Sequence, residues 1–372
     1  MNLIIAGDFC PIGRAISYLN SSVSFVDPKI IDLIQRSNIS IVNLECPIVN
    51  NECYPIDKCG PNLKSDSRAL EFLSRIGFKS VTLANNHLND YGSEGILQTI
   101  NSIEKNGLLY VGAGLNLSDA ERTLYINSPE GVVSIINCCE HEFSIATDDA
   151  PGSNPLSLTN QYYRIKEARE LSDYVILIVH GGPEHYQLPT PRMQDWYRFF
   201  IDCGADAVVN HHQHCISGVE SYKGHPIIYG IGNFCFDSNA YREDKWNYGL
   251  LASLNIINKK INFDLIPFKQ FSNNPHISLL TDDELLKIKA EIEHLSLIIA
   301  DRTRLNDAYK SYLDSTIKSS KYCFEPYDNR LLSALYRRGI LPSLLSKRKI
   351  LKLQNFIECE SHVEKLIYSL KK

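Results

Sequence analysis

The chain has 372 residues, 44% of them hydrophobic and 22% charged, so it is long and apolar enough to bury a sizeable core. Its formal net charge of -5 means that the overall basic excess typical of nucleic-acid-binding proteins is absent. No apolar run approaches the roughly 20 residues of a transmembrane helix, and residues 1–8 lack the basic start and apolar stretch of a secretory signal. We therefore expect a cytoplasmic protein without a transmembrane segment, whose chain begins directly in a buried strand.

Cysteine usage agrees with this compartment. The sequence holds 11 cysteines, an odd number, and Cys138 and Cys139 are adjacent. Without an export signal, this pattern predicts reduced thiols rather than a disulfide framework. No CxxC pair is present, so a cysteine-based zinc site is not expected.

Short runs rich in Ile and Val alternate with helical patterns between residues 1 and 270. The runs predicted as strands are 2–7, 40–44, 79–84, 108–112, 132–138, 174–180, 206–210, 226–230 and 249–256. Helices are predicted at 28–36, 66–76, 93–106 and 191–203, and loops at 46–66 and 144–160. Such an alternation predicts an α/β fold in which helices cover the sheets.

The pattern changes after residue 275, where strands bounded by glycine stop. Thr281 and Glu284 form a capping-box pattern, which predicts a helix N-terminus. Apolar residues then follow at steps of three and four, at Leu285, Ile288, Ile292, Leu295 and Ile299. Further helical segments are predicted at 303–319 and 329–370. We predict one domain at 1–275 and a helical C-terminal extension at 276–372, whose apolar stripe must be covered by the domain or by a protein partner.

Polar side chains follow six of the predicted strands, at the point where each strand ends. They are Asp8, Glu45, Asn86 with His87, His180, then His211, His212 and His214, and finally Asn233. In open α/β sheets, ligands bind outside the carboxyl ends of the strands. A turn explains any one of these residues, but independent turns have no reason to recruit histidine repeatedly. The sequence therefore predicts that these side chains share one pocket.

The residue types indicate the chemistry of this pocket. Oxygen and imidazole ligands together suit Mn, Fe, Zn or Mg rather than a thiophilic metal. In an extended segment, His212 and His214 point to the same side, and His211 points away from them.

The order of these motifs resembles one known family. The motifs are Gly7-Asp8, Asn43-Leu44-Glu45, Asn85-Asn86-His87-Leu88-Asn89-Asp90-Tyr91-Gly92, His180-Gly181-Gly182-Pro183-Glu184, Asp206 to His214, and Tyr229 to Phe234. The series resembles the CapA poly-γ-glutamate capsule family, a divergent branch of the calcineurin-like metallophosphoesterases, over about residues 2–240. The resemblance implies a metallophosphoesterase-like four-layer sandwich, with two mixed β-sheets flanked by helices.

The resemblance also implies roles for single residues. One or two divalent ions would be held by Asp8, Glu45, Asn86, His180, His212 and His214, with Glu45 between the two ions. His87 matches the histidine that protonates a leaving group, and Glu184 is a second catalytic candidate. His211 and Asn233 are the candidates for substrate binding.

Two departures from the family pattern affect the metal site. Phosphoesterases carry Asp-x-His at the first motif, where this chain has Asp8-Phe9-Cys10. CapA relatives usually carry Gly-His-His-Pro-His at the last motif, where Asn210 and Gln213 replace the glycine and the proline. A metal-free site is therefore an alternative.

Three functions fit these residues. The first is a metal-dependent hydrolase of phosphoester, acyl or peptide bonds. The family resemblance alone implies that it acts in capsule or poly-γ-glutamate biosynthesis. The second is a metal-independent peptide epimerase, in which acid and base residues of the same pocket remove and return a Cα proton. The third is a non-catalytic scaffold that binds a polymer synthase through its C-terminal helices. The substrate would be a peptide, polyglutamate or a phosphoester, and nucleic acid is not expected.

Overall fold

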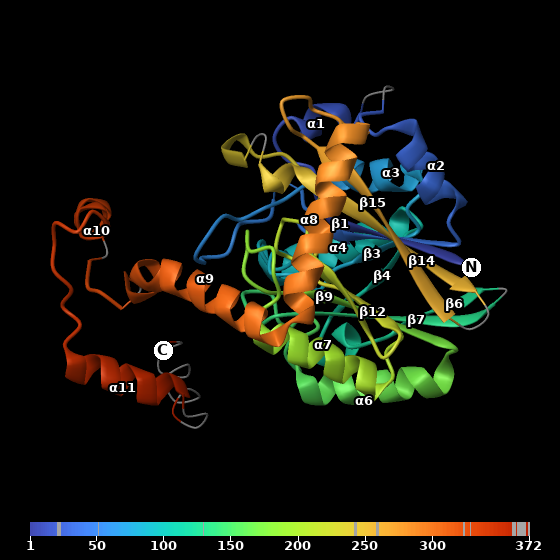
Figure 1. Ribbon diagram of the computed structural model, residues 1–372. Coiled ribbons are helices and arrows are strands. Elements are labelled where there is room, and N and C mark those ends of the chain that lie inside the picture. Colours follow the sequence, from blue (N-terminus) through green and yellow to red (C-terminus); the bar gives the residue numbers. More distant parts are fainter. Residues whose placement is uncertain are drawn as a thin grey trace. The chain divides into compact units, whose positions relative to one another are not determined.

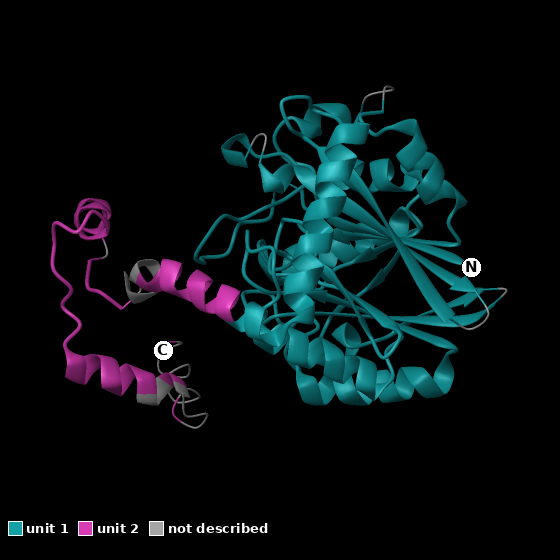
Figure 2. Cartoon of the chain, viewed as in Figure 1, with its two compact units in different colours: residues 1–306 teal, residues 307–372 magenta. Residues whose placement is uncertain are grey.

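The computed structural model describes residues 1–20, 24–50, 52–128, 130–241, 244–257, 260–322, 324–327, 329–358, 362 and 370. It divides into two compact units, residues 1–306 and 307–372 (Figure 2). None of the described helices is both long and apolar enough to cross a membrane.

Two mixed β-sheets form the centre of the first unit (Figure 1). The first sheet has the order β16 (Ile277–Leu279), β15 (Lys260–Gln270), β14 (Tyr248–Ile257), β1 (Asn2–Cys10), β2 (Ile39–Leu44), β3 (Ser80–Thr82) and β4 (Leu109–Val111), and β13 (Asn233–Phe236) also pairs with β1. The second has the order β11 (Val219–Tyr222), β12 (His225–Ile228), β10 (Ala207–His211), β9 (Tyr174–His180), β7 (Gly131–Cys139) and β6 (Leu124–Ser128). A small third sheet pairs β5 (Ala113–Gly114) with β8 (Gly152–Ser153).

Successive side chains of β1 point to opposite faces of the first sheet, so this strand contributes to two core layers. Leu3 and Ile5 point into the core between the two large sheets, where they meet residues of the second sheet such as Ile176. Ile4 and Ala6 point to the opposite face, into the core under the helices. Because both faces are covered, residues 3–6 of the strand are an unbroken apolar run rather than a polar–apolar alternation.

Helices cover the outer faces of both sheets. On the first sheet lie α2 (Pro28–Arg36), α3 (Ser67–Ile76) and α4 (Gly92–Lys105), whose apolar residues join the core on that side. On the second lie α6 (Leu158–Leu171) and α7 (Pro191–Cys203), which pack side by side against β7, β9 and β10 (Figure 1). Shorter helices are α1 (Ala15–Tyr18), α5 (Leu117–Ala120), η1 (Asn239–Tyr241) and η2 (Lys245–Asn247). The predicted sandwich of two mixed sheets flanked by helices is confirmed.

The helix α8 (Asp282–Ala300) begins at the predicted capping box, in which Thr281 and Glu284 bond each other's backbone. Its stripe is covered by the first unit itself: Ile288 and Ile292 join the core between the sheets, and Ile299 is fully buried. The helices α9 (Arg302–Tyr322), α10 (Arg330–Arg337) and α11 (Lys347–Glu358) follow, so the extension is helical as predicted. Whether residues 1–275 form a self-sufficient domain stays a prediction.

The docking of α8 predicts a stability effect. We expect Ile299→Ala to lower the free energy of unfolding by about 2–5 kcal/mol, because it opens a cavity in a fully buried position. Leu297→Ala on the same helix is the matched control, since Leu297 is 56% exposed and its loss is expected to stay within about 0.5 kcal/mol. Urea unfolding of the two variants measures the difference, and equal values would show that α8 is not packed on this unit in solution.

The cysteines offer a second check on the packing. The nine cysteines within the described residues are all free, whereas Cys323 and Cys359 lie outside those residues. Of these nine, Cys59 is exposed and the others are buried. Burial raises the pKa of Cys10, Cys138 and Cys235, which makes their reactive thiolate form scarce.

We therefore expect Cys59→Ser to remove one rapidly reacting thiol from the native protein and to leave the slow thiols unchanged. Thiol titration with an aromatic disulfide, before and after denaturation, makes the measurement. Rapid labelling of Cys10 or Cys138 in the native protein, found by peptide mass spectrometry, would contradict the buried positions.

Candidate functional site

Both large sheets contribute to one site at the carboxyl ends of their parallel strands. Asp8 lies near the end of β1, and Glu45 directly follows β2. His180 is the last residue of β9, and His211 is the last residue of β10, where the two are register partners. The site therefore lies at one edge of the sandwich, between the two sheets.

The end of β1 has an unusual backbone that places Asp8. The pairing register of β1 with β2 shifts between Ala6 and Asp8, so the strand bulges there. Gly7 allows this approach, because a Cβ atom at this position would lie 1.8 Å from the carbonyl oxygen of Gly232. The backbone N–H of Asp8 donates to that same oxygen at 3.2 Å.

Asp8 is fully buried and collects several donors. Its Oδ1 accepts a hydrogen bond from Asn43 Nδ2 at 2.7 Å, and its Oδ2 lies 3.3 Å from His214 Nδ1. Burial acts to raise the pKa of Asp8, but the hydrogen bond with His214 and the charge of that ring hold it below its usual value. Asp8 is therefore an anion in the folded protein.

Glu45 is the second buried carboxylate, and it has no hydrogen-bond partner on either oxygen. Its Oε1 lies 3.5 Å from His214 Nε2 and 3.8 Å from His180 Nε2. Burial and the neighbouring charge of Asp8 raise the pKa of Glu45 well above its usual value. An unsatisfied buried carboxylate is costly, and a cation between these groups would remove that cost.

His180 lies between the other candidates. Its Nε2 is 3.1 Å from Asn86 Oδ1 and 3.0 Å from His212 Nδ1. Burial, reinforced by the neighbouring His212, lowers the pKa of His180 well below its usual value. Burial, with His214 as the next cause, also lowers the pKa of His212. Both rings are thus neutral, which is the form that binds metal ions.

The segment from His211 to His214 is not extended throughout, although the prediction of its side-chain directions assumes an extended backbone. β10 ends at His211, and His212 and His214 have positive φ angles of 87° and 54°. His212 and His214 still reach the site, but His211 does so as well: its Nδ1 lies 3.7 Å from Asp8 Oδ1. The expectation that His211 points away is therefore wrong, because strand alternation ends where the backbone becomes left-handed.

His214 is oriented by Asn233. The ring nitrogen Nδ1 of His214 lies 2.9 Å from Asn233 Oδ1, and Asn233 Nδ2 donates to the carbonyl oxygen of Trp246 at 3.1 Å. Burial acts to lower the pKa of His214, but the hydrogen bond and the charge of Asp8, together with Glu184 and Asn233, outweigh burial, and the pKa is raised. These contacts support an orienting role for Asn233, and its predicted role in substrate binding stays untested.

His87 follows β3 in a series of turns and diverges from its neighbour Asn86. Its Nδ1 lies 2.7 Å from Asp90 Oδ2, whereas Asn86 turns to His180. Asp90 is fully buried and also accepts from the backbone N–H of Leu63 at 2.6 Å. The second carboxylate oxygen of Asp90 forms an ion pair with Lys58, whose side chain is only 2% exposed.

Sequence reasoning missed the supporting roles of Asp90, Lys58 and Asn43. Asp90 stands three residues after His87, a spacing at which a turn brings two side chains together. This spacing could have predicted the contact between them. Nothing in the sequence singles out Lys58, because it lies in a loop that folds back from a distance of 32 residues. Glu184 is exposed, and its catalytic role stays a prediction.

Three groups of side chains place their ligand atoms within 4.8 Å of one another. They are Asp8, His180 and His211; then Glu45, His180 and His212; and finally Asp8, Glu45 and His214. Carboxylate and imidazole donors, together with the orphaned oxygens of Glu45, fit one or two divalent cations. The predicted ligands are thus brought together, and metal binding itself remains to be tested.

Comparison with known proteins agrees with this arrangement of motifs. The capsule biosynthesis protein CapA of Bacillus anthracis is 32% identical over 203 residues, which cover 52% of this chain and 49% of that protein. The PGA biosynthesis protein CapA of Bacillus subtilis strain 168 is 30% identical over 222 residues, covering 59% of this chain and 57% of that protein. The chain thus spans about half the length of these curated relatives.

Solved structures add a distant similarity. The calcineurin-like phosphoesterase YfkN from Bacillus subtilis aligns with a TM-score of 0.43 at 12% identity, covering 81% of this chain and 99% of that one. A similarity of this size supports no conclusion about function. The sequence profile of the bacterial capsule synthesis protein PGA_cap, in contrast, matches residues 2–238. The chain therefore belongs to the bacterial capsule synthesis PGA_cap family, as the motif resemblance implies.

Proposed function

We propose that the chain is a metal-dependent hydrolase of phosphoester, acyl or peptide bonds that serves capsule or poly-γ-glutamate biosynthesis. The observation that carries the proposal is the meeting of two buried carboxylates and four histidines from two sheets around the unpartnered oxygens of Glu45. Without a cation, this arrangement is a costly one to bury. The biosynthetic context comes from the names of the relatives.

Under this proposal, two sets of side chains would each hold one ion. Asp8, Glu45 and His214 would hold one ion. Glu45, His180 and His212 would hold a second, with Asn86 beside His180 as a further oxygen donor. Divalent ions supply Lewis-acid stabilisation of the negative charge that develops on a phosphoryl or carbonyl oxygen.

The chain's own residues would handle the proton. The carboxylate of Asp90 accepts from Nδ1 of His87, which leaves Nε2 of His87 to exchange a proton with the substrate. Lys58 and the backbone N–H of Leu63 hold Asp90 in place for this task. In this role, Asp90 would orient the imidazole of His87 and keep the proton on its Nδ1.

Metal content tests the proposal most directly. Protein purified without added ions is expected to contain one or two equivalents of a divalent metal by mass spectrometry. A chelator is then expected to abolish hydrolysis of bis(p-nitrophenyl) phosphate, and Mn²⁺ to restore it. A wild-type protein that neither retains nor binds divalent metal would refute the metal-dependent hydrolase.

The epimerase alternative has one observation in its favour. Position 10 is a buried cysteine, so the first motif lacks a histidine that phosphoesterases use as a ligand. Metal-free protein that exchanges the Cα hydrogen of a peptide for deuterium would establish that alternative, with His87 as a candidate acid or base.

A further inference from the structure

His211 is a buried imidazole to which neither the proposed ligand set nor the proton transfer assigns a task. Its side chain is 1% exposed, and neither ring nitrogen has a hydrogen-bond partner. Leaving a buried polar group unpaired costs about 1–3 kcal/mol, so an unpaired imidazole in a native site calls for an explanation.

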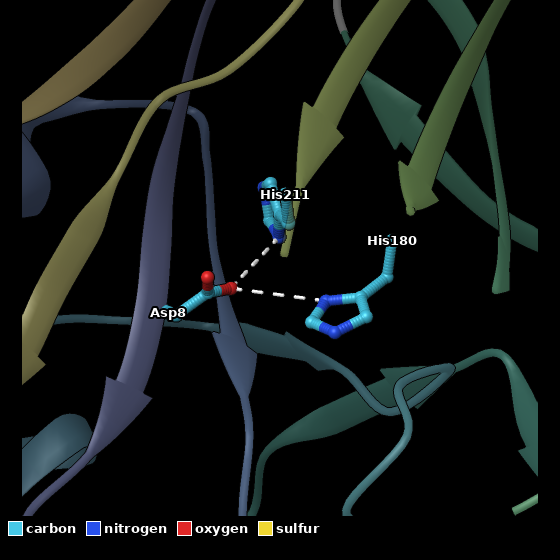
Figure 3. Close-up of side chains that lie close together, drawn as sticks. All are labelled: Asp8, His180 and His211. Atoms are coloured by element: carbon cyan, nitrogen blue, oxygen red, sulfur yellow. Dashed lines mark ion pairs between the residues drawn. The ribbon is translucent and has the colours of Figure 1, made fainter. Parts of the chain in front are cut away.

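The ring faces Asp8 from the second sheet. His211 Nδ1 lies 3.7 Å from Asp8 Oδ1, and His180 Nδ1 lies 3.9 Å from the same oxygen (Figure 3). These three ligand atoms lie within 4.8 Å of one another. Burial lowers the pKa of His211, with Asp8 opposing, so the ring is neutral and offers a lone pair.

The proposed metal site at Asp8 lacks one imidazole ligand that phosphoesterases have. In phosphoesterases, the residue two places after the aspartate is a histidine, and here it is Cys10. Cys10 is fully buried within the apolar core under the helices, and burial raises the pKa of its thiol. None of the candidate metal groups among the described residues includes Cys10.

We propose that His211 is a ligand of the metal ion at Asp8 and replaces, from the opposite sheet, the imidazole that position 10 does not supply. The proposal rests on the proposed metal dependence and takes the place of the substrate-binding role predicted for His211. The ion is a divalent cation that accepts mixed oxygen and nitrogen donors, such as Mn²⁺, Fe²⁺ or Zn²⁺.

The test measures Mn²⁺ binding, which needs no substrate. Metal-free wild type, His211→Gln and His294→Gln are titrated with Mn²⁺ by calorimetry, and the bound ion is examined by pulsed electron paramagnetic resonance. Because even residues that only support a ligand are worth about 10–100-fold in metal affinity, His211→Gln is expected to weaken one binding event at least tenfold. It is also expected to reduce the nitrogen coupling of the bound ion.

His294→Gln is the matched control, because His294 is exposed on α8, and it is expected to bind as the wild type does. If the wild type binds Mn²⁺ and His211→Gln binds it equally well with unchanged nitrogen coupling, the role of His211 is overturned while the hydrolase proposal stands. If the wild type binds no divalent ion, both proposals fail. Thermal melts without metal show whether each variant is folded, and His211→Ala replaces the glutamine variant if that one is not.

Discussion

Replacing His87 by alanine is expected to lower turnover by about 10²–10⁴-fold while leaving the bound metal unchanged. The reason is the separation of two neighbouring residues: Asn86 turns to His180, whereas His87 turns to Asp90. Removing the ring therefore removes a proton donor but no ligand. Hydrolysis of an aryl phosphodiester and metal analysis of the same samples make the comparison.

The supporting carboxylate provides an internal check. Asp90→Asn is expected to lower turnover in the same direction, because an amide in place of the carboxylate no longer fixes the proton on Nδ1 of His87. His294→Ala, an exposed histidine on α8, is expected to behave as the wild type. Loss of metal from His87→Ala would show that His87 is a ligand, and the assigned role would then be wrong.

Glu45→Gln is expected to have opposite effects on metal binding and on the stability of the metal-free protein. Glu45 belongs to both proposed ligand sets, so its neutralisation is expected to weaken binding by more than the 10–100-fold that supporting residues are worth. In the metal-free protein at neutral pH, the same change replaces a buried carboxyl group, whose charged form is disfavoured by burial and by Asp8, with a neutral amide, and we expect this to stabilise the fold.

The stability effect carries a pH signature. The pKa of Glu45 is raised in the folded protein above its ordinary 4.5, so the folded state binds a proton that the unfolded chain releases. Stability contributed by this group therefore falls as the pH rises above about 4.5, and Glu45→Gln lacks that fall. Urea unfolding in a chelator at several pH values measures the difference, with Glu293→Gln on the exposed face of α8 as the control. A glutamine variant that is less stable than the wild type throughout would contradict the account.

The sequence predicts the strands and ligands that local pattern determines. The predicted end of β9 at His180 is its observed end, and Glu45 directly follows β2 as predicted, because apolar residues dominate both buried strands. The end of β1 was predicted too early, because the strand continues through Gly7 and Asp8 to Cys10. The helix α6 was not predicted as a whole, because its buried face includes Gln161 and Ala168 and its apolar stripe is weak. β15 also escaped prediction, although Ile261, Phe263 and Leu265 alternate along it.

The parts of the site that the sequence misses depend on the backbone and on distant contacts. The orientation of His211 follows from the left-handed residues after it, and His212 gives no sign of a positive φ in its residue type. Lys58 reaches Asp90 through a loop without regular structure. The local sequence pattern therefore identifies which residues meet in the site, whereas the backbone conformation and distant contacts determine how their side chains are oriented there.

The division of the site between two sheets has a mechanical consequence. Asp8 and Glu45 come from the first sheet, and His180 and His211 from the second, so the side chains of the interlayer core set the gap between the carboxylates and these imidazoles. Ile178 stands two residues before His180 and is fully buried in that core. Changes in the thickness of the core are thus transmitted to the site without any contact with a ligand, and a cation held by both sheets would act as a cross-link that resists their separation.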